Sequence, residues 1–496
     1  MRILEALVLF ISIISFFCII FYKIEKRKAM IVVAVIIYLF VALQIILEGY
    51  RWQMLLGYFA PLILIIASKL FLLFRNKKKY WMQSGIITFS IIYMIIMVGL
   101  PHLFPIFSFE KPTGNYFIST NSYHLIDKNR KEEQALDKDK YRELMIQIWY
   151  PSKETNSFQP EPYIENVGAI TNGLQRALSI PKWTFSHLNL VNAYARKNLT
   201  IADDRDNFPI LIFSHGMTGF RNQNTFQIEE LVSHGYIIVG IDHVYDAAAT
   251  VFPNGKEILL EQNNLSGFEK LDPHMKIWTD DISFVLDTLE KWNSGNDIDI
   301  FKDKLNMKKI GMFGHSYGGA TAAQMLLKDS RIKVALNMDG VLYGERIPET
   351  GFLKPYMQIN AEKSIDKSVF DAALDTAVSL SGKSRSSYEE FWKESQQRRE
   401  NALKGKGFSL SIRNTSHMSF TDFHLFSPLL SNKGEDIRKV HKIINEISLA
   451  YFDKYLMEKE NTSIWDLINR YPEVELQRGG ANDYQKSKKL SSSMAF

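Results

Sequence analysis

Residues 311–319 read Gly-Met-Phe-Gly-His-Ser-Tyr-Gly-Gly and end a short apolar run. The five residues from Gly314 to Gly318 have the G-x-S-x-G pattern, which places a serine in a tight turn between a strand and a helix. The turn strains the backbone at the serine, so the positions two before and two after it must be small. The preceding residues favour a buried strand and the following ones a helix. The stretch therefore predicts that Ser316 is a nucleophile for acyl transfer to water.

The pattern on either side of this turn predicts an α/β-hydrolase fold, a mostly parallel sheet with helices on both faces, for residues 115–478. From residue 208 onward, short apolar strands alternate with helices, as in a parallel sheet. Two strands, 115–126 and 142–151, precede this region. The later strands are expected at Pro209–Ser214, Tyr236–Asp242, Lys309–Phe313, Val334–Met338, Tyr356–Asn360 and Phe408–Arg413, and helices at 223–234, 272–293, 317–328 and 434–457.

A serine nucleophile needs a base, and in this fold the histidine follows the last strand. His417 comes directly after the strand that ends at Arg413, so we expect it to take the serine proton and return it to the leaving group. His424, seven residues later, is the alternative.

The acid that orients the histidine lies between the serine and the histidine in chain order. Asp339 ends the apolar run Val334–Met338, and the carboxyl end of a strand lies at the rim of the site. We expect Asp339 to hold the imidazole tautomer and to stabilise the imidazolium. Glu362 and Asp366, which follow the next strand, are the alternatives.

An oxyanion hole requires two backbone N–H groups. One is expected from Tyr317, the residue after the nucleophile, and the other from the loop 214–219, where Met217 is our choice. His215 in this loop is a candidate for holding the loop in place rather than for proton transfer.

The first 104 residues are mostly apolar and predict a four-helix membrane region. Each segment is near the length of about 20 residues that crosses a bilayer. The segments are Met1–Tyr22, Ala29–Glu48, Gln53–Phe74 and Ile86–Phe104. The first has no small-residue cleavage site and is followed closely by another apolar segment, so we expect it to stay on the chain rather than to be a signal peptide.

The positive charge of the short loops predicts the orientation. Loops 23–28 and 75–80 are rich in Lys and Arg, whereas loop 49–52 holds only Arg51. Loops 23–28 and 75–80 should therefore be cytoplasmic, which makes the chain a four-pass protein of the cell membrane with its catalytic part on the extracytoplasmic side. The alternative is that these basic loops only bind anionic lipid.

Two later segments stand apart from the catalytic pattern. Residues 361–406 form a charged insertion between two expected strands, which is either a lid over the site or a helical excursion on the surface. Residues 479–496 are polar and rich in Ser and Lys, which predicts a disordered tail. The 496-residue chain has a net charge of +5, much of it in the membrane loops and this tail, so we expect no nucleic-acid partner.

Several stretches give the chain a resemblance to the plasma and intracellular type II platelet-activating-factor acetylhydrolase family. They are Glu143–Pro151 (ELMIQIWYP), Phe213–Arg221 (FSHGMTGFR), Ser233–Gly240 with Asp242-His243, Gly314–Thr321 (GHSYGGAT), Met338-Asp339 and His417–Phe423 (HMSFTDF). By position, the resemblance assigns Ser316, Asp339 and His417 to the triad and Met217 and Tyr317 to the oxyanion hole. It implies hydrolysis of short or oxidised sn-2 acyl chains of phospholipids, without calcium. The membrane segments and the long insertion depart from the family pattern.

The sequence thus predicts a membrane-anchored serine ester hydrolase that needs no cofactor and no metal, with a phospholipid carrying an sn-2 acetyl group as the expected substrate. A broad-specificity carboxylesterase, lipase or polyester hydrolase is the alternative on the same triad. A less favoured possibility is a membrane sensor with a hydrolase-like binding module, because the membrane region has few interior polar groups, chiefly Gln44 and Lys69. The sequence leaves the oligomeric state open.

Overall fold

The computed structural model describes residues 1–21, 27–135, 137–154, 159–261, 265–459 and 463–479. The chain forms two compact units. One comprises Met1–Ser108, Thr184–Val191 and Leu425–Leu430, and the other comprises Phe109–Trp183, Asn192–His424 and the chain from Ser431 onward.

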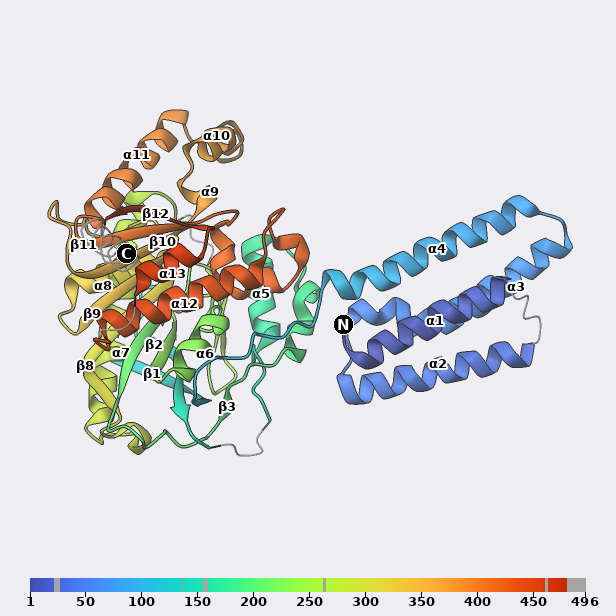
Figure 1. Ribbon diagram of the computed structural model, residues 1–496, viewed down its shortest axis with the longest axis horizontal. Helices are drawn as coiled ribbons and strands as arrows, with labels where there is room; N and C mark the ends of the chain where they lie inside the picture. Colours follow the sequence, from blue (N-terminus) through green and yellow to red (C-terminus); the bar gives the residue numbers. More distant parts are fainter. Residues whose placement is uncertain (22–26, 136, 155–158, 262–264, 460–462, 480–496) are drawn as a thin grey trace, which may run out of the picture. The chain divides into compact units, whose positions relative to one another are not determined.

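The first unit is built around four helices, α1 (Ile3–Phe21), α2 (Arg27–Glu48), α3 (Leu55–Asn76) and α4 (Tyr80–Leu103), which pack alongside one another (Figure 1). Their apolar side chains lie both inside the bundle, as Ile37 and Met97 do, and on its surface, as Leu39 and Ile46 do. Helices that are apolar all round are typical of a membrane region. In the described residues, Ile31–Glu48, Trp52–Arg75 and Tyr80–Leu103 are long and apolar enough to cross a bilayer, whereas the apolar stretch of α1, Ile3–Cys18, is shorter.

The bundle also contains charged groups that hydropathy did not single out. Glu5 of α1 and Arg51 lie 2.8 Å apart with both side chains fully buried. Arg51 also donates to the carbonyl of Phe104. Of the polar residues named from the sequence, Gln44 is buried and accepts from Tyr58, while Lys69 is exposed. A buried charge pair is retained only where each partner is compensated, as here.

The second unit is organised on a ten-stranded sheet in the order β12-β11-β10-β9-β8-β4-β5-β2-β1-β3. Neighbours from β11 to β5 run parallel, while β1, β2 and β5 pair antiparallel at one side and β12 pairs antiparallel with β11 at the other. The strands are β1 (Phe117–Lys131), β2 (Tyr141–Ser152), β3 (Arg196–Lys197), β4 (Phe208–Ser214), β5 (Ile237–Asp242), β8 (Leu305–His315), β9 (Ile332–Met338), β10 (Phe352–Ala361), β11 (Gly405–Ile412) and β12 (Val474–Gly479). This is the mixed α/β fold with a mostly parallel sheet that the sequence predicted.

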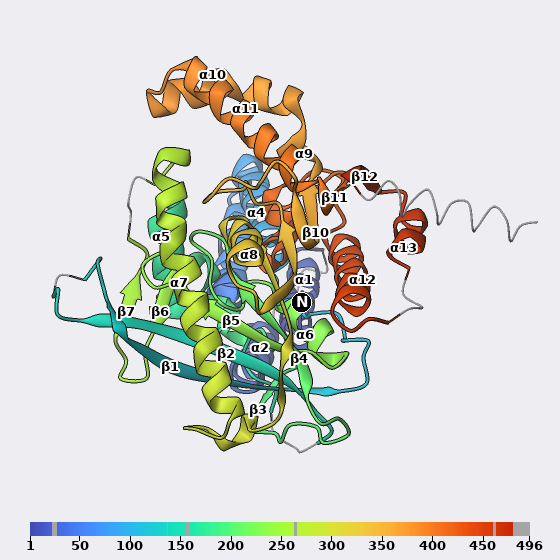
Figure 2. The same cartoon turned by 90° about the vertical axis from the view of Figure 1, so that its left-hand side faces the viewer.

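Helices cover both faces of this sheet. Figure 2 shows α7 (Phe268–Asn293) and α8 (Tyr317–Lys328) on one face, and α6 (Thr225–Ser233) and α12 (Ile437–Tyr455) on the other. The central strands β4 and β5 are buried along their whole length, as expected of parallel strands covered on both faces. Outside the insertion, this unit also contains the helices α5 (Val167–Leu178) and α13 (Ile464–Arg470). The strand β6 (Ala249–Val251) pairs with β7 (Glu257–Leu259) in a separate hairpin.

The insertion 361–406 folds as a short helix α9 (Glu362–Ile365) and two longer helices, α10 (Lys367–Ser381) and α11 (Arg385–Ala402). The helix α13, the strand β12 and the β6–β7 hairpin were not predicted. They are short, and strands paired at a sheet edge carry little hydrophobic pattern. Apart from Gly479, which ends β12, the predicted tail 479–496 lies outside the described residues.

Candidate active site

The G-x-S-x-G stretch forms the turn between β8 and α8. Ser316 has φ 55° and ψ −122°, in the left-handed half of backbone space that side chains rarely occupy. A Cβ on Gly314 would lie 2.4 Å from the backbone of Gly318, and one on Gly318 would lie 2.1 Å from the carbonyl oxygen of Ser214. The two glycines are therefore required by the close approach of β4 to the turn, as the sequence pattern predicted.

Asp339 follows the last residue of β9 and receives three hydrogen bonds. Its Oδ2 lies 2.7 Å from His417 Nδ1 and accepts from Ser364 Oγ at 2.7 Å, while Oδ1 accepts from the Ala361 N–H at 2.8 Å. The side chain is only 2% exposed. The alternatives are used elsewhere: Glu362 accepts from the Asn414 N–H, and Asp366 caps α10 by accepting from Ser368. Of the three candidate acids, the structure therefore brings Asp339 to the histidine.

His417 begins the turn after β11 and lies beside the elbow. Its ring centroid is 4.5 Å from that of His315, the residue before Ser316, and its carbonyl oxygen is 2.9 Å from His315 Nε2. The imidazole is 44% exposed, which leaves it open to a ligand. Within the described parts of the chain, no hydrogen bond joins the Ser316 hydroxyl to His417. Such contacts are often long in unliganded enzymes and tighten when substrate binds.

The other histidines downstream of Ser316 are engaged in packing. His424 is buried, with Nδ1 3.2 Å from Glu435. His441, which the sequence reasoning overlooked, is buried and stacked on Phe226 with ring centroids 3.7 Å apart. Burial lowers the pKa of His441 to about 3. Neither lies beside Asp339, so the choice between His417 and His424 falls to His417.

The two expected oxyanion donors lie in the same region. Tyr317 is the first residue of α8, where an N–H has no acceptor within its own helix. In the described residues, the N–H of Met217 makes no hydrogen bond either, whereas its neighbour Thr218 donates to the Asp246 carbonyl. Both side chains belong to one apolar cluster with Leu271 and Trp278. Two backbone donors are thus available near the elbow.

His215 holds the loop that carries Met217. Its Nε2 accepts from the His243 N–H at 3.1 Å, so the ring proton lies on Nδ1, which donates to the Gly216 carbonyl at 2.6 Å. The ring is fully buried, and burial lowers the pKa of His215 to about 3. A neutral imidazole with both nitrogens occupied fits the positioning role considered from the sequence.

Behind this loop lies a buried polar cluster that sequence reasoning missed. His243 Nε2 is 2.9 Å from Ser214 Oγ, and His243 Nδ1 is 2.9 Å from Asp281 Oδ2. Arg142 makes a two-pronged contact with Asp281, and this charge holds the pKa of Asp281 far below its usual value despite burial. The sequence signal for this cluster was a set of charged residues in otherwise apolar stretches. Such a pattern does not show which of these residues contact one another in the fold.

Comparisons with known proteins agree with this architecture. The family model described as platelet-activating factor acetylhydrolase, isoform II, matches residues 131–474. Platelet-activating factor acetylhydrolase of Cavia porcellus is 26% identical over 354 residues, which cover 65% of this chain and 75% of that protein. A probable 1-alkyl-2-acetylglycerophosphocholine esterase of Arthroderma benhamiae is 26% identical over 292 residues, covering 56% and 70% of the two chains.

The fold is also found in a solved structure. Ferulic acid esterase from Streptomyces cinnamoneus superposes with a TM-score of 0.57 at 23% identity, covering 75% of this chain and 99% of that one. This likeness concerns the fold alone. The family match extends over more than half of the chain and includes the elbow, Asp339 and His417. The chain therefore belongs to the platelet-activating factor acetylhydrolase, isoform II, family of carboxylic ester hydrolases.

Proposed function

We propose that the chain is a membrane-anchored serine ester hydrolase of the α/β-hydrolase type with Ser316, His417 and Asp339 as its triad. The observation that carries this proposal is the 2.7 Å contact between His417 Nδ1 and Asp339 Oδ2 beside the strained turn at Ser316. Asp339 fixes the proton on Nδ1, which leaves Nε2 free to act as the base.

The reaction follows from these positions. His417 takes the proton of the Ser316 hydroxyl as its oxygen attacks the ester carbonyl. The N–H groups of Met217 and Tyr317 stabilise the oxyanion that forms. His417 then protonates the leaving alcohol, an acyl-enzyme remains on Ser316, and water activated by His417 releases the acid. No step requires a metal or another cofactor.

The proposed substrate is a phospholipid with an sn-2 acetyl group or another short or oxidised acyl group. The names of the relatives, platelet-activating factor acetylhydrolase and 1-alkyl-2-acetylglycerophosphocholine esterase, support this class. A broad-specificity carboxylesterase, lipase or polyester hydrolase is the alternative, and it would use the same three residues.

We further propose that residues 1–104 anchor the enzyme by four membrane crossings, with the catalytic domain, residues 115–478, on the extracytoplasmic side. Three helices with the length and hydropathy of membrane spans support an anchor. The fourth crossing is α1. Its Glu5, in the first turn of the helix, pairs with Arg51, and a charge pair is tolerated near the end of a membrane helix. The basic loops 23–28 and 75–80 support the orientation.

Labelling with a fluorophosphonate probe tests the proposal. The purified full-length protein should react, Ser316→Ala should not, and Ser214→Ala should react like the wild type because Ser214 lies in the buried cluster. A membrane-impermeant probe should label intact cells if the catalytic domain is extracytoplasmic, and only lysed cells if it is cytoplasmic. A folded wild-type protein that does not react would contradict the enzyme and favour a sensor with a binding module.

A further inference from the structure

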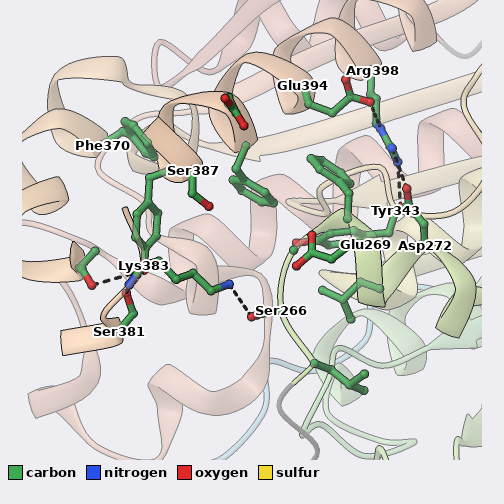
Figure 3. Close-up of a pocket in the computed structure, with 18 of the residues that line it drawn as sticks. Ser266, Glu269, Asp272, Tyr343, Phe370, Ser381, Lys383, Ser387, Glu394 and Arg398 are labelled. Carbon is green, nitrogen blue, oxygen red and sulfur yellow. Dashed lines mark hydrogen bonds and ion pairs between the residues drawn. The ribbon is translucent and has the colours of Figure 1, made fainter. Parts of the chain in front are cut away.

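A large cavity lies in the second unit between the start of α7 and the inserted helices α10 and α11 (Figure 3). Its volume is about 1220 Å³. Pockets for small molecules usually measure about 300–1,000 Å³, so this one has room for a large ligand. One wall is the segment 265–273, which leads into α7, and Tyr343 also lines the cavity.

The inserted helices face the cavity with one side each. On α10 the lining residues are Phe370, Ala373, Leu374, Ala377 and Ser381, and on α11 they are Ser387, Tyr388, Glu390, Phe391, Glu394 and Arg398. Both sets recur at three- and four-residue spacing, which defines one face of a helix. The apolar members of these faces therefore point into the cavity. The insertion does more than cover surface, because its helices supply half of the wall.

Aromatic rings and neutralised charges line the interior. Phe268 stacks on Phe391 with ring centroids 4.9 Å apart and lies 5.2 Å from the ring of Tyr343. Arg398 lies over Phe268 at 3.9 Å and pairs with Asp272 at 2.7 Å. Arg398 is buried and Asp272 is partly exposed, and each already has a charged partner, so what the cavity offers a ligand is mostly apolar surface. The carboxylates of Glu269 and Glu390 are exposed to solvent.

This wall continues to the catalytic elbow. The hydroxyl of Tyr317, the residue after Ser316, donates to the Leu271 carbonyl at 2.7 Å, and Leu271 lines the cavity. The rings of Tyr317 and Tyr343 have centroids 5.6 Å apart. Met217 packs in the same apolar cluster. Met217 and Tyr317, the proposed oxyanion donors, thus pack against residues that line the cavity.

We propose that this cavity holds the long hydrocarbon chain of a lipid ester whose carbonyl reacts at Ser316. The proposal rests on the proposed function and adds the place in the fold where the long chain of the substrate lies. It also assigns the insertion 361–406 a role as a wall of the substrate site. This hydrocarbon chain could belong to the acyl group or to the alcohol of the ester. The experiment below distinguishes these two possibilities.

Two tryptophan substitutions on α10 test the assignment. Ala373→Trp places an indole ring on the wall of the cavity, whereas Ala372→Trp adds the same ring at the neighbouring position, which is also exposed but does not line the cavity. In the full-length protein, kcat/KM is measured for p-nitrophenyl esters of increasing acyl length and for acetate esters of increasing alcohol length. Each buried methylene contributes about fourfold to binding, so displacing two or more should lower the long-to-short ratio at least about tenfold in Ala373→Trp.

The outcomes separate the possibilities. A loss in the acyl series places the acyl chain in the cavity, and a loss in the alcohol series places the alkyl chain there. Equal ratios in Ala373→Trp, Ala372→Trp and the wild type in both series would overturn the proposal.

A binding measurement is independent of turnover. Ser316→Ala should bind a hexadecyl phosphocholine more tightly than an octyl one, and adding Ala373→Trp should remove the difference, whereas adding Ala372→Trp should not. Failure of the ester assay with this binding pattern intact would contradict the proposed function alone. No chain-length preference in binding would contradict the cavity assignment.

Discussion

Two histidine–aspartate pairs in the catalytic unit have nearly the same geometry and different surroundings. His417 Nδ1 lies 2.7 Å from Asp339, and His243 Nδ1 lies 2.9 Å from Asp281. Among the described residues, only in the second pair is the histidine itself hydrogen-bonded to a serine hydroxyl, since Ser214 Oγ lies 2.9 Å from His243 Nε2. Yet His243 and Asp281 are fully buried, whereas His417 is 44% exposed.

The difference shows that hydrogen-bond geometry alone does not mark the active site. Ser214 lies at the end of a buried regular strand, while Ser316 lies in a strained turn at the start of a helix. Asp281 is already neutralised by Arg142, so it has no charge left to stabilise a new imidazolium. A reacting serine needs access for substrate, nearby N–H donors and an acid that can stabilise the imidazolium. Of these two regions, the one around Ser316 fits these requirements better, which supports the proposed triad.

Replacing each aspartate should separate the two pairs most clearly. Asp339→Asn keeps the shape but loses control of the His417 tautomer, so kcat should fall about 10³- to 10⁴-fold with little change in the unfolding free energy. Asp281→Asn leaves Arg142 buried with less compensation, so the unfolding free energy should fall by about 3 kcal/mol or more. Steady-state kinetics and denaturant unfolding of both variants measure the two effects. An Asp281→Asn protein with native stability and no activity would reverse the assignment.

The sequence predicted the exposed pair, His417 and Asp339, and missed the buried pair, His243 and Asp281. Both results depend on where the residues lie relative to the strands. Ser316, Asp339 and His417 each follow a strand, and parallel strands bring their carboxyl ends to one edge. Asp281 is in the middle of α7 and Arg142 near the start of β2, and no local pattern relates them. Ser364, which binds Asp339, was missed because it comes from the insertion. The parallel strands were predicted within a few residues because their apolar runs are distinct, whereas the edge strand β12 has no such run.

The second-largest effect is expected from acidification, which should lower the unfolding free energy through the buried histidines. Burial lowers the pKa of His215 to about 3, from an ordinary value of 6.5, and His243 lies against it. The unfolded chain therefore binds more protons than the folded one below about pH 6.5, so the unfolding free energy should fall as the pH drops towards 3. One such group contributes up to about 4 kcal/mol.

Denaturant unfolding between pH 7 and pH 4 measures this loss. His215→Gln removes the titrating ring, so the variant should start less stable at pH 7 and lose less on acidification. A wild-type protein whose stability is constant from pH 7 to pH 4 would contradict neutral burial of His215.

The smallest effects should come from the outer partners of the two aspartates. Ser364 Oγ donates to the same oxygen of Asp339 that faces His417. Ser364→Ala leaves His417 Nδ1 and the Ala361 N–H as the donors to that carboxylate. A hydrogen bond to a charged group contributes about 1.5–3 kcal/mol, so kcat should fall about tenfold to a hundredfold. In the buried pair, Arg130 donates to Asp281 at 2.8 Å, and Arg130→Gln should lower stability by about 1 kcal/mol with kcat unchanged. Kinetics and unfolding of the two variants measure both. If Ser364→Ala lowered the unfolding free energy but left kcat unchanged, the insertion would support the fold around Asp339 without stabilising the charge that the reaction uses. The outer partner of Asp339 would then act like that of Asp281, through stability alone.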